Sequence, residues 1–111
     1  MLPAANRLRT AADFRETTRR GFRVTRGSVV VYLTRHDAPD EPRVGVIVSK
    51  AIGGSVQRHR AARRIRAAVG PLLATVPRGA TIVVRALPGA DTDPRLRHDV
   101  DSGLTHLLAD R

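Results

Sequence analysis

The stretch SVQRHRAARRIRAAVG, residues 55–70, determines how the rest of this 111-residue chain is interpreted. In an α-helix, which turns by about 100° per residue, the apolar residues of this region gather on one side: Ala61, Ile65, Ala68, Val69 and Leu72. Basic residues spread over the opposite side: His59, Arg60, Arg63, Arg64 and Arg66. We therefore predict an amphipathic helix over residues 56–73, with its regular part ending near Val69 because Pro71 interrupts it.

Two apolar runs flank this helix and have the composition of β-strands. RVGVIVS, residues 43–49, places valine at every second position, and ATIVVRA, residues 80–86, is rich in β-branched residues. Ser55 follows two glycines and is placed to cap the helix. A strand, a helix and a strand in this order imply that the two strands are parallel.

The remaining segments predict one more strand and two more helices. SVVVYLTR, residues 28–35, is typical of a strand, and the polar DAPDEP, residues 37–42, predicts an exposed hairpin loop after it. One helix is expected from a cap at Thr10 towards Gly21, and another follows the Asp-Pro pair at 93–94 and continues to the end.

The element order is therefore α-β-β-α-β-α. Strands and helices alternate too irregularly for a doubly wound sheet. We predict the α+β class, as a small α/β sandwich that forms a single domain over residues 1–111. Its core sheet has three strands, with room for an additional short strand.

Positive charge dominates the composition, with 20 Lys and Arg against 10 Asp and Glu and a net charge of +10. Nine positive residues lie within residues 42–90, which contain no acid. A polyanionic partner is the first hypothesis, and nucleic acid is favoured. An anionic membrane surface would need bulkier apolar residues on the helix. A merely solvated face would alternate its charges, whereas Arg60 and Arg64 repel each other.

The residues for several other functions are missing. The absence of cysteine excludes disulfides, Cys-based zinc sites and thiol nucleophiles. The acids lie where loops and helix starts use them, and the four histidines show no metal-ligand spacing, so we predict neither catalytic residues nor metal ligands. No apolar run is long enough for a signal-peptide core or a membrane span, so we expect a soluble cytoplasmic protein.

The string SKAIGGSVQRHRAARRIRAAV, residues 49–69, resembles the signature of the bacterial ribonuclease P protein subunit. The matching residues are Ser49, Lys50, Gly53, Val56, Arg58, Arg63, Arg64 and Arg66. Further matches occur outside this string: Arg7, Leu8, Phe14, Gly21 and Arg85. Departures from the signature are Ala51, Gly54, Ser55, His59 and Ala67. The likeness covers nearly the whole chain.

This resemblance implies an α/β sandwich with an unusual left-handed βαβ crossover. It implies that the basic helix and the loop before it bind a catalytic RNA. A separate cleft between the sheet and the first helix would take the single-stranded 5′ leader of precursor tRNA. The RNA, using Mg²⁺, would hydrolyse the phosphodiester bond, while the protein improves substrate affinity and metal use. A non-catalytic ribosomal or RNA-packaging protein and a stand-alone nuclease are the alternatives.

The two expected RNA contacts involve different residues. The catalytic RNA is expected to contact Lys50, Arg58, His59, Arg60, Arg63, Arg64 and Arg66. The leader is expected to contact Arg9, Phe14, Arg15, Arg19, Phe22 and Tyr32. The aromatic residues have a second interpretation as core, and for Phe14 core packing is favoured over stacking on an unpaired base. Without RNA the chain is expected to be a monomer.

Overall fold

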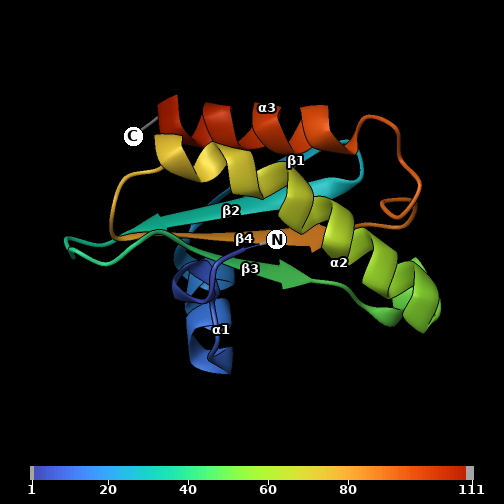
Figure 1. The fold of residues 1–111 in the computed structure, drawn as a ribbon, viewed down its shortest axis with the longest axis horizontal. Coiled ribbons are helices and arrows are strands. Elements are labelled where there is room, and N and C mark those ends of the chain that lie inside the picture. The colour runs from blue at the N-terminus through green and yellow to red at the C-terminus, as the bar shows by residue number, and fades with distance from the viewer. Residues whose placement is uncertain (1, 110–111) are drawn as a thin grey trace.

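The computed structural model describes residues 2–109 as a four-stranded sheet with helices on both faces (Figure 1). The strands are β1 (Phe22–Arg26), β2 (Val29–Arg35), β3 (Arg43–Ile47) and β4 (Ala80–Ala86). The helices are α1 (Ala11–Arg20), α2 (Ser55–Val69) and α3 (Leu96–Ala109), with short 3-10 segments η1 (Ala4–Asn6), η2 (Lys50–Ile52) and η3 (Gly70–Thr75). α2 and α3 cover one face of the sheet, and α1 lies against the other. The predicted α+β class is confirmed.

The helix boundaries follow local sequence signals. The Thr10 hydroxyl accepts a hydrogen bond from the Asp13 amide at 3.1 Å and so caps α1, as predicted. α2 ends at Val69, also as predicted, and Pro71 lies in the 3-10 segment that follows. The prediction for Ser55 was wrong, because Ser55 is the first residue of α2 and the cap position belongs to Gly54.

The sheet contains a strand that lay outside the three predicted core strands. β1 pairs with β2 in antiparallel register, with Arg26 opposite Val29. Only Gly27 and Ser28 separate the two strands, and Gly27 adopts the left-handed φ of 54° that a tight hairpin turn requires. A two-residue Gly-Ser turn between alternating segments is the sequence signal for this hairpin.

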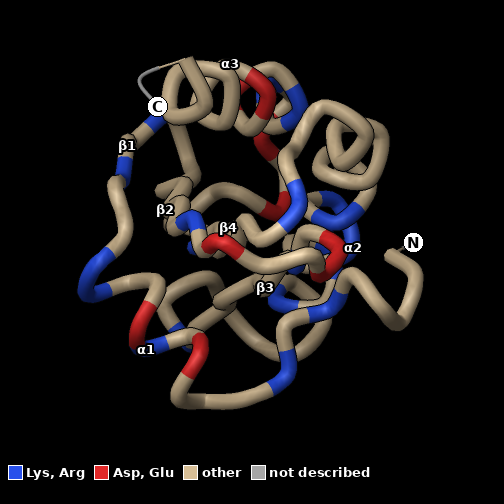
Figure 2. Tube along the Cα trace, turned by 90° about the vertical axis from the view of Figure 1, so that its left-hand side faces the viewer, with Lys and Arg blue, Asp and Glu red and all other residues tan. Residues whose placement is uncertain are grey.

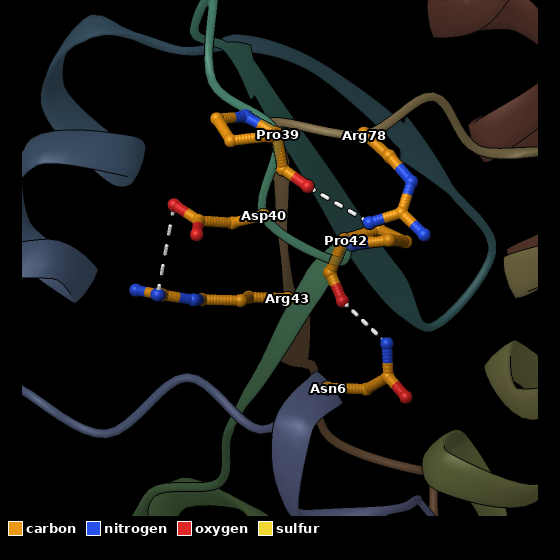
Figure 3. A network of polar contacts seen from close by, with 6 residues as sticks. All are labelled: Asn6, Pro39, Asp40, Pro42, Arg43 and Arg78. Carbon is orange, nitrogen blue, oxygen red and sulfur yellow. Dashed lines mark hydrogen bonds and ion pairs between the residues drawn. The ribbon is translucent and has the colours of Figure 1, made fainter.

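β2 and β3 do not form the hairpin that the polar loop between them suggested. β4 lies between them and pairs antiparallel with β2 and parallel with β3. The parallel pair is the one predicted. Polar contacts instead hold the 37–42 loop (Figure 3): Arg78 donates to the Pro39 carbonyl at 2.8 Å, and Asn6 donates to the Pro42 carbonyl at 2.8 Å.

The connection from β3 through α2 to β4 is left-handed, as the family resemblance implied. Figure 2 views the molecule from the left of Figure 1, so that β3 and β4 run away from the reader. In that view the path from β3 over α2 to β4 turns counter-clockwise. Nearly all such units are right-handed. The hand follows from β4 entering between β2 and β3 while α2 remains on the face that it shares with α3.

The main core lies between the sheet and the helix pair of α2 and α3. Ala61, Ile65 and Val69 of α2 have no exposed surface, which confirms the predicted apolar stripe. α3 adds the buried side chains of Leu96, Val100, Leu104 and Leu107. The β2 residues that belong to this core are Val29, Val31 and Leu33, as the alternation predicted.

A smaller apolar cluster lies on the opposite face, beneath α1. Its buried residues are Leu8, Val30, Tyr32 and Val83. Phe14 of α1 packs against this cluster and is half-buried. Its ring lies so close to Gly45 of β3 that a Cβ atom at that position would overlap it. The missing side chain of Gly45 therefore provides the space in which Phe14 packs.

We expect Gly45→Ala to lower the free energy of unfolding by about 1–3 kcal/mol, because the added methyl group overlaps the Phe14 ring. Urea denaturation followed by circular dichroism measures the change. Gly70→Ala is the matched control: nothing lies within 4 Å of a Cβ there, and φ is −47°. The control should keep or slightly raise stability. Wild-type stability of Gly45→Ala would contradict the close packing of Phe14.

Candidate nucleic-acid interface

The outward side of α2 presents a row of cations to solvent. The exposed basic residues are His59, Arg60, Arg63 and Arg66, and Lys50 of η2 is also exposed. Between residues 2 and 109, ion pairs join only Arg43 to Asp40 and Arg78 to Glu41. The charges on this side of α2 are therefore uncompensated and available to a polyanion.

Arg64 does not belong to this outward row, and its predicted contact with the catalytic RNA stays a prediction. Its guanidinium donates to the carbonyl oxygens of Ala90 at 2.9 Å and Asp93 at 2.6 Å, and the side chain is half-buried. Arg64 immediately precedes the buried Ile65, so its side chain lies at the border between the apolar stripe and the exposed side of the helix. It fastens α2 to the loop that leads into α3.

Asp93 extends this contact to the β1–β2 turn. Its carboxylate accepts a hydrogen bond from the Ser28 hydroxyl at 2.6 Å and another from the Arg95 amide at 2.9 Å. These two hydrogen bonds, with Ser28 the larger cause, lower the pKa of Asp93 below its ordinary value. The ionised carboxylate therefore joins the turn to the loop, and the backbone carbonyl of Asp93 joins the loop to α2.

Arg58 occupies an intermediate position at the start of α2. By helical spacing it lies on the side of Ala61 and Ile65, and it is half-buried. Its Nε atom is buried and has no hydrogen-bond partner in the part of the chain that the structure describes. Its predicted contact with the catalytic RNA stays a prediction.

The face beneath α1 brings together only some of the residues predicted to bind the leader. Tyr32 is 2% exposed, so its ring supports this face from within and offers no open surface for stacking. This corrects its assignment as a direct contact. The guanidinium carbon of Arg85 lies 5.8 Å from the centre of the Tyr32 ring, and Arg85 is exposed. The alternation of β4 puts Arg85 on the face of Val83, a signal that identifies it as a further candidate.

Phe22 lies on the wrong face for the predicted leader cleft. It is directly opposite Leu33 across the β1–β2 pair, so both side chains point to the face of α2 and α3. Phe14 packs on the other face. Phe22 is 53% exposed near the edge of the sheet. The remaining predicted residues, Arg9, Arg15 and Arg19, are exposed.

Residues from the two predicted RNA surfaces meet in one groove of about 540 Å³. Phe14 from α1 and Gly45 from β3 line it together with basic residues of α2: His59, Arg63 and Arg66. Arg7, at the start of the chain segment that runs beside β3, completes its basic rim. The predicted leader and catalytic-RNA surfaces are therefore adjacent at the edge of the sheet.

Comparison with known proteins agrees with this arrangement. A family model described as Ribonuclease P matches residues 2–108. The chain belongs to the ribonuclease P protein family. The ribonuclease P protein component of Beutenbergia cavernae is 46% identical over 109 residues, which cover 96% of this chain and 92% of that protein. The protein component of Streptomyces griseus is 45% identical and covers 97% of this chain and 96% of its own length.

A solved structure extends the likeness to three dimensions. The ribonuclease P protein of Staphylococcus aureus superimposes with a TM-score of 0.75 at 27% identity, covering 96% of this chain and 94% of that one. The chain is thus a protein subunit of ribonuclease P. No helix within residues 2–109 is long and apolar enough to cross a membrane.

Arg63 and Arg64, adjacent in sequence, should respond differently to replacement by alanine. Arg64→Ala removes two hydrogen bonds from a charged group and should lower the free energy of unfolding by about 1–3 kcal/mol. Arg63→Ala, at an exposed position, should change it by less than about 0.5 kcal/mol. Chemical denaturation measures both. Wild-type stability of Arg64→Ala, combined with weakened RNA binding, would return Arg64 to the RNA-binding surface.

Proposed function

We propose that this subunit assembles with the catalytic RNA of ribonuclease P through α2 and η2 and holds the 5′ leader of precursor tRNA on the face beneath α1. The row of exposed, unpaired cations on α2 carries the first part of this proposal. Phe14 and Arg85, which lie on the opposite face, support the second part.

The geometry of α2 suits the backbone of a folded RNA. A rigid helix whose underside is fully buried presents its cations at fixed positions, which favours phosphates over base edges. Double-stranded RNA is recognised mainly through its shape, phosphates and 2′-hydroxyl groups. In this proposal the contacts come from Lys50, Arg58, His59, Arg60, Arg63 and Arg66, without Arg64.

The face beneath α1 suits a single strand. Proteins bind unpaired nucleic acid by combining a basic groove with aromatic surfaces. Phe14 supplies a half-buried ring, and Arg85 supplies an exposed guanidinium near the Tyr32 ring on the same face of the sheet. Arg9, Arg15 and Arg19 add charge along the same end of the chain. Phe22 is left out of this proposal because it points to the other face.

In this proposal the RNA performs the phosphodiester hydrolysis and uses Mg²⁺ for it. The protein contributes affinity for the substrate and raises the effective use of the metal by neutralising nearby phosphates. No group of three His, Asp or Glu within residues 2–109 is arranged to hold a metal ion. We further propose that the subunit is a monomer before it meets the RNA and that it acts in the cytoplasm.

Reconstitution tests whether the RNA or the protein performs the hydrolysis. The chain is incubated with precursor tRNA at low Mg²⁺, with and without the RNA subunit, and the released leader is quantified. We expect no cleavage by the protein alone and a strong stimulation of the RNA by the protein. Cleavage by the protein alone would overturn the assignment of hydrolysis to the RNA, and a lack of stimulation would favour a packaging role.

Assembly with the catalytic RNA should depend steeply on salt. If about five phosphates are neutralised, the logarithm of the binding constant should fall with a slope near −4, or a few hundredfold between 50 and 200 mM salt. Filter binding measures this slope. Arg60→Ala should reduce its magnitude by about one, whereas Arg97→Ala, an exposed arginine on α3, should leave it unchanged. A salt-insensitive complex would contradict binding through α2.

A further inference from the structure

His59 is the only histidine among the residues predicted to bind the catalytic RNA. The other residues of that surface are lysine and arginine, whose side chains ordinarily stay charged at every physiological pH. A histidine side chain, in contrast, gains or loses a proton between about pH 5 and 8. The number of positive charges that this surface presents to a polyanion therefore depends on pH.

His59 borders two basic hollows on the surface of α2. In the groove at the edge of β3 it lies with Arg7 and Arg66. In a second hollow, at the start of α2, it lies with Arg60. Arg63, one helical turn after His59, lines both hollows. The exposed imidazole of His59 is therefore placed among arginines from α2 and from the N-terminal segment.

The protein supplies no negative partner for a protonated His59. All other lining residues of the two hollows are uncharged, including those contributed by α1 and β3. Within residues 2–109, no ion pair involves His59. An imidazolium at this position therefore gains a counter-charge when an anion binds and has none from the protein itself.

We propose that His59 takes up a proton from solvent when the catalytic RNA binds, so that assembly of the subunit with this RNA strengthens as the pH falls. The proposal rests on the proposed function, because it concerns the same surface of α2. A phosphate beside an imidazole favours its protonated form. Proton uptake and RNA binding are then reciprocal, since each increases the affinity for the other by the same factor.

The direction of the effect follows from this reciprocity. At low pH the imidazole carries a proton in the free and in the bound protein, and affinity is highest. As the pH rises, the free protein loses the proton first, so the binding constant falls until the imidazole is neutral in both states. One additional neutralised phosphate at low pH should also steepen the logarithmic salt dependence by about 0.9.

Filter binding of the protein to the RNA subunit at about pH 5.5 and about pH 8 tests the proposal. The wild type should bind about tenfold more tightly at the lower pH, which corresponds to one unit of preferential protonation by a neighbouring opposite charge. His59→Gln should bind with the weaker affinity at both pH values. His59→Arg should bind with the stronger affinity at both. The position is exposed, so all variants should fold, which circular dichroism verifies.

His98→Gln is the matched control, because His98 is exposed on α3 and lines neither hollow. It should keep the pH dependence of the wild type. Three results would each overturn the proposal: equal wild-type affinity at both pH values, a pH dependence that persists in His59→Gln, and a pH dependence that disappears in His98→Gln. The second result would assign the proton to another group of the protein or of the RNA.

Calorimetry on the wild-type protein is a second measurement that requires no variant. Titration with the RNA subunit at about pH 7, in two buffers of different ionisation enthalpy, gives the number of protons taken up on binding. We expect a net uptake, and zero uptake or a release of protons would contradict the proposal. Failure of the proposed function has a separate signature, because binding would then be insensitive to salt at both pH values. Steep salt dependence without proton uptake would reject the role of His59 alone.

Discussion

The burial of the α2 underside against the sheet is the constraint on which the interface depends. Ala61, Ile65 and Val69 are fully buried, and this fixes the rotation of the helix about its axis. Once that rotation is set, the helical period places Arg60 and Arg63 on the side away from the sheet, where both are exposed. The same apolar contacts that stabilise the fold therefore oppose the mutual repulsion of the cations and hold them in a fixed array.

Periodicity predicted the helix, its end and its two sides, but it did not resolve the residues at the boundary between them. Arg64 lies next to Ile65 in the sequence, and its orientation depends on the carbonyl groups of Ala90 and Asp93. Those groups come from a loop almost thirty residues later, whose position no local pattern reveals. A flanking arginine can extend outward or turn along the helix surface, and tertiary contacts decide between the two.

The sheet shows the same limit at the level of topology. The alternation within each strand predicted which side chains face the main core, and Val29, Val31 and Leu33 lie there. The order of the strands in the sheet was not predictable in this way. A loop rich in turn residues can close a hairpin between neighbouring strands, or it can connect two strands that another strand separates. β4 enters between β2 and β3. Phe22 and Phe14 lie on opposite faces for another reason: Phe22 pairs opposite Leu33, whereas Phe14 packs on the smaller cluster.

The edge position of β3 explains how two surfaces on different faces of a sheet come to share a groove. The left-handed crossover brings α2 beside β3, and Phe14 of α1 packs on Gly45 of that strand from the other side. Were β3 an interior strand, a neighbouring strand would separate Phe14 from Arg63. The unusual hand of the connection and the glycine in the edge strand thus act together, and they join the two faces proposed to bind RNA into one continuous surface.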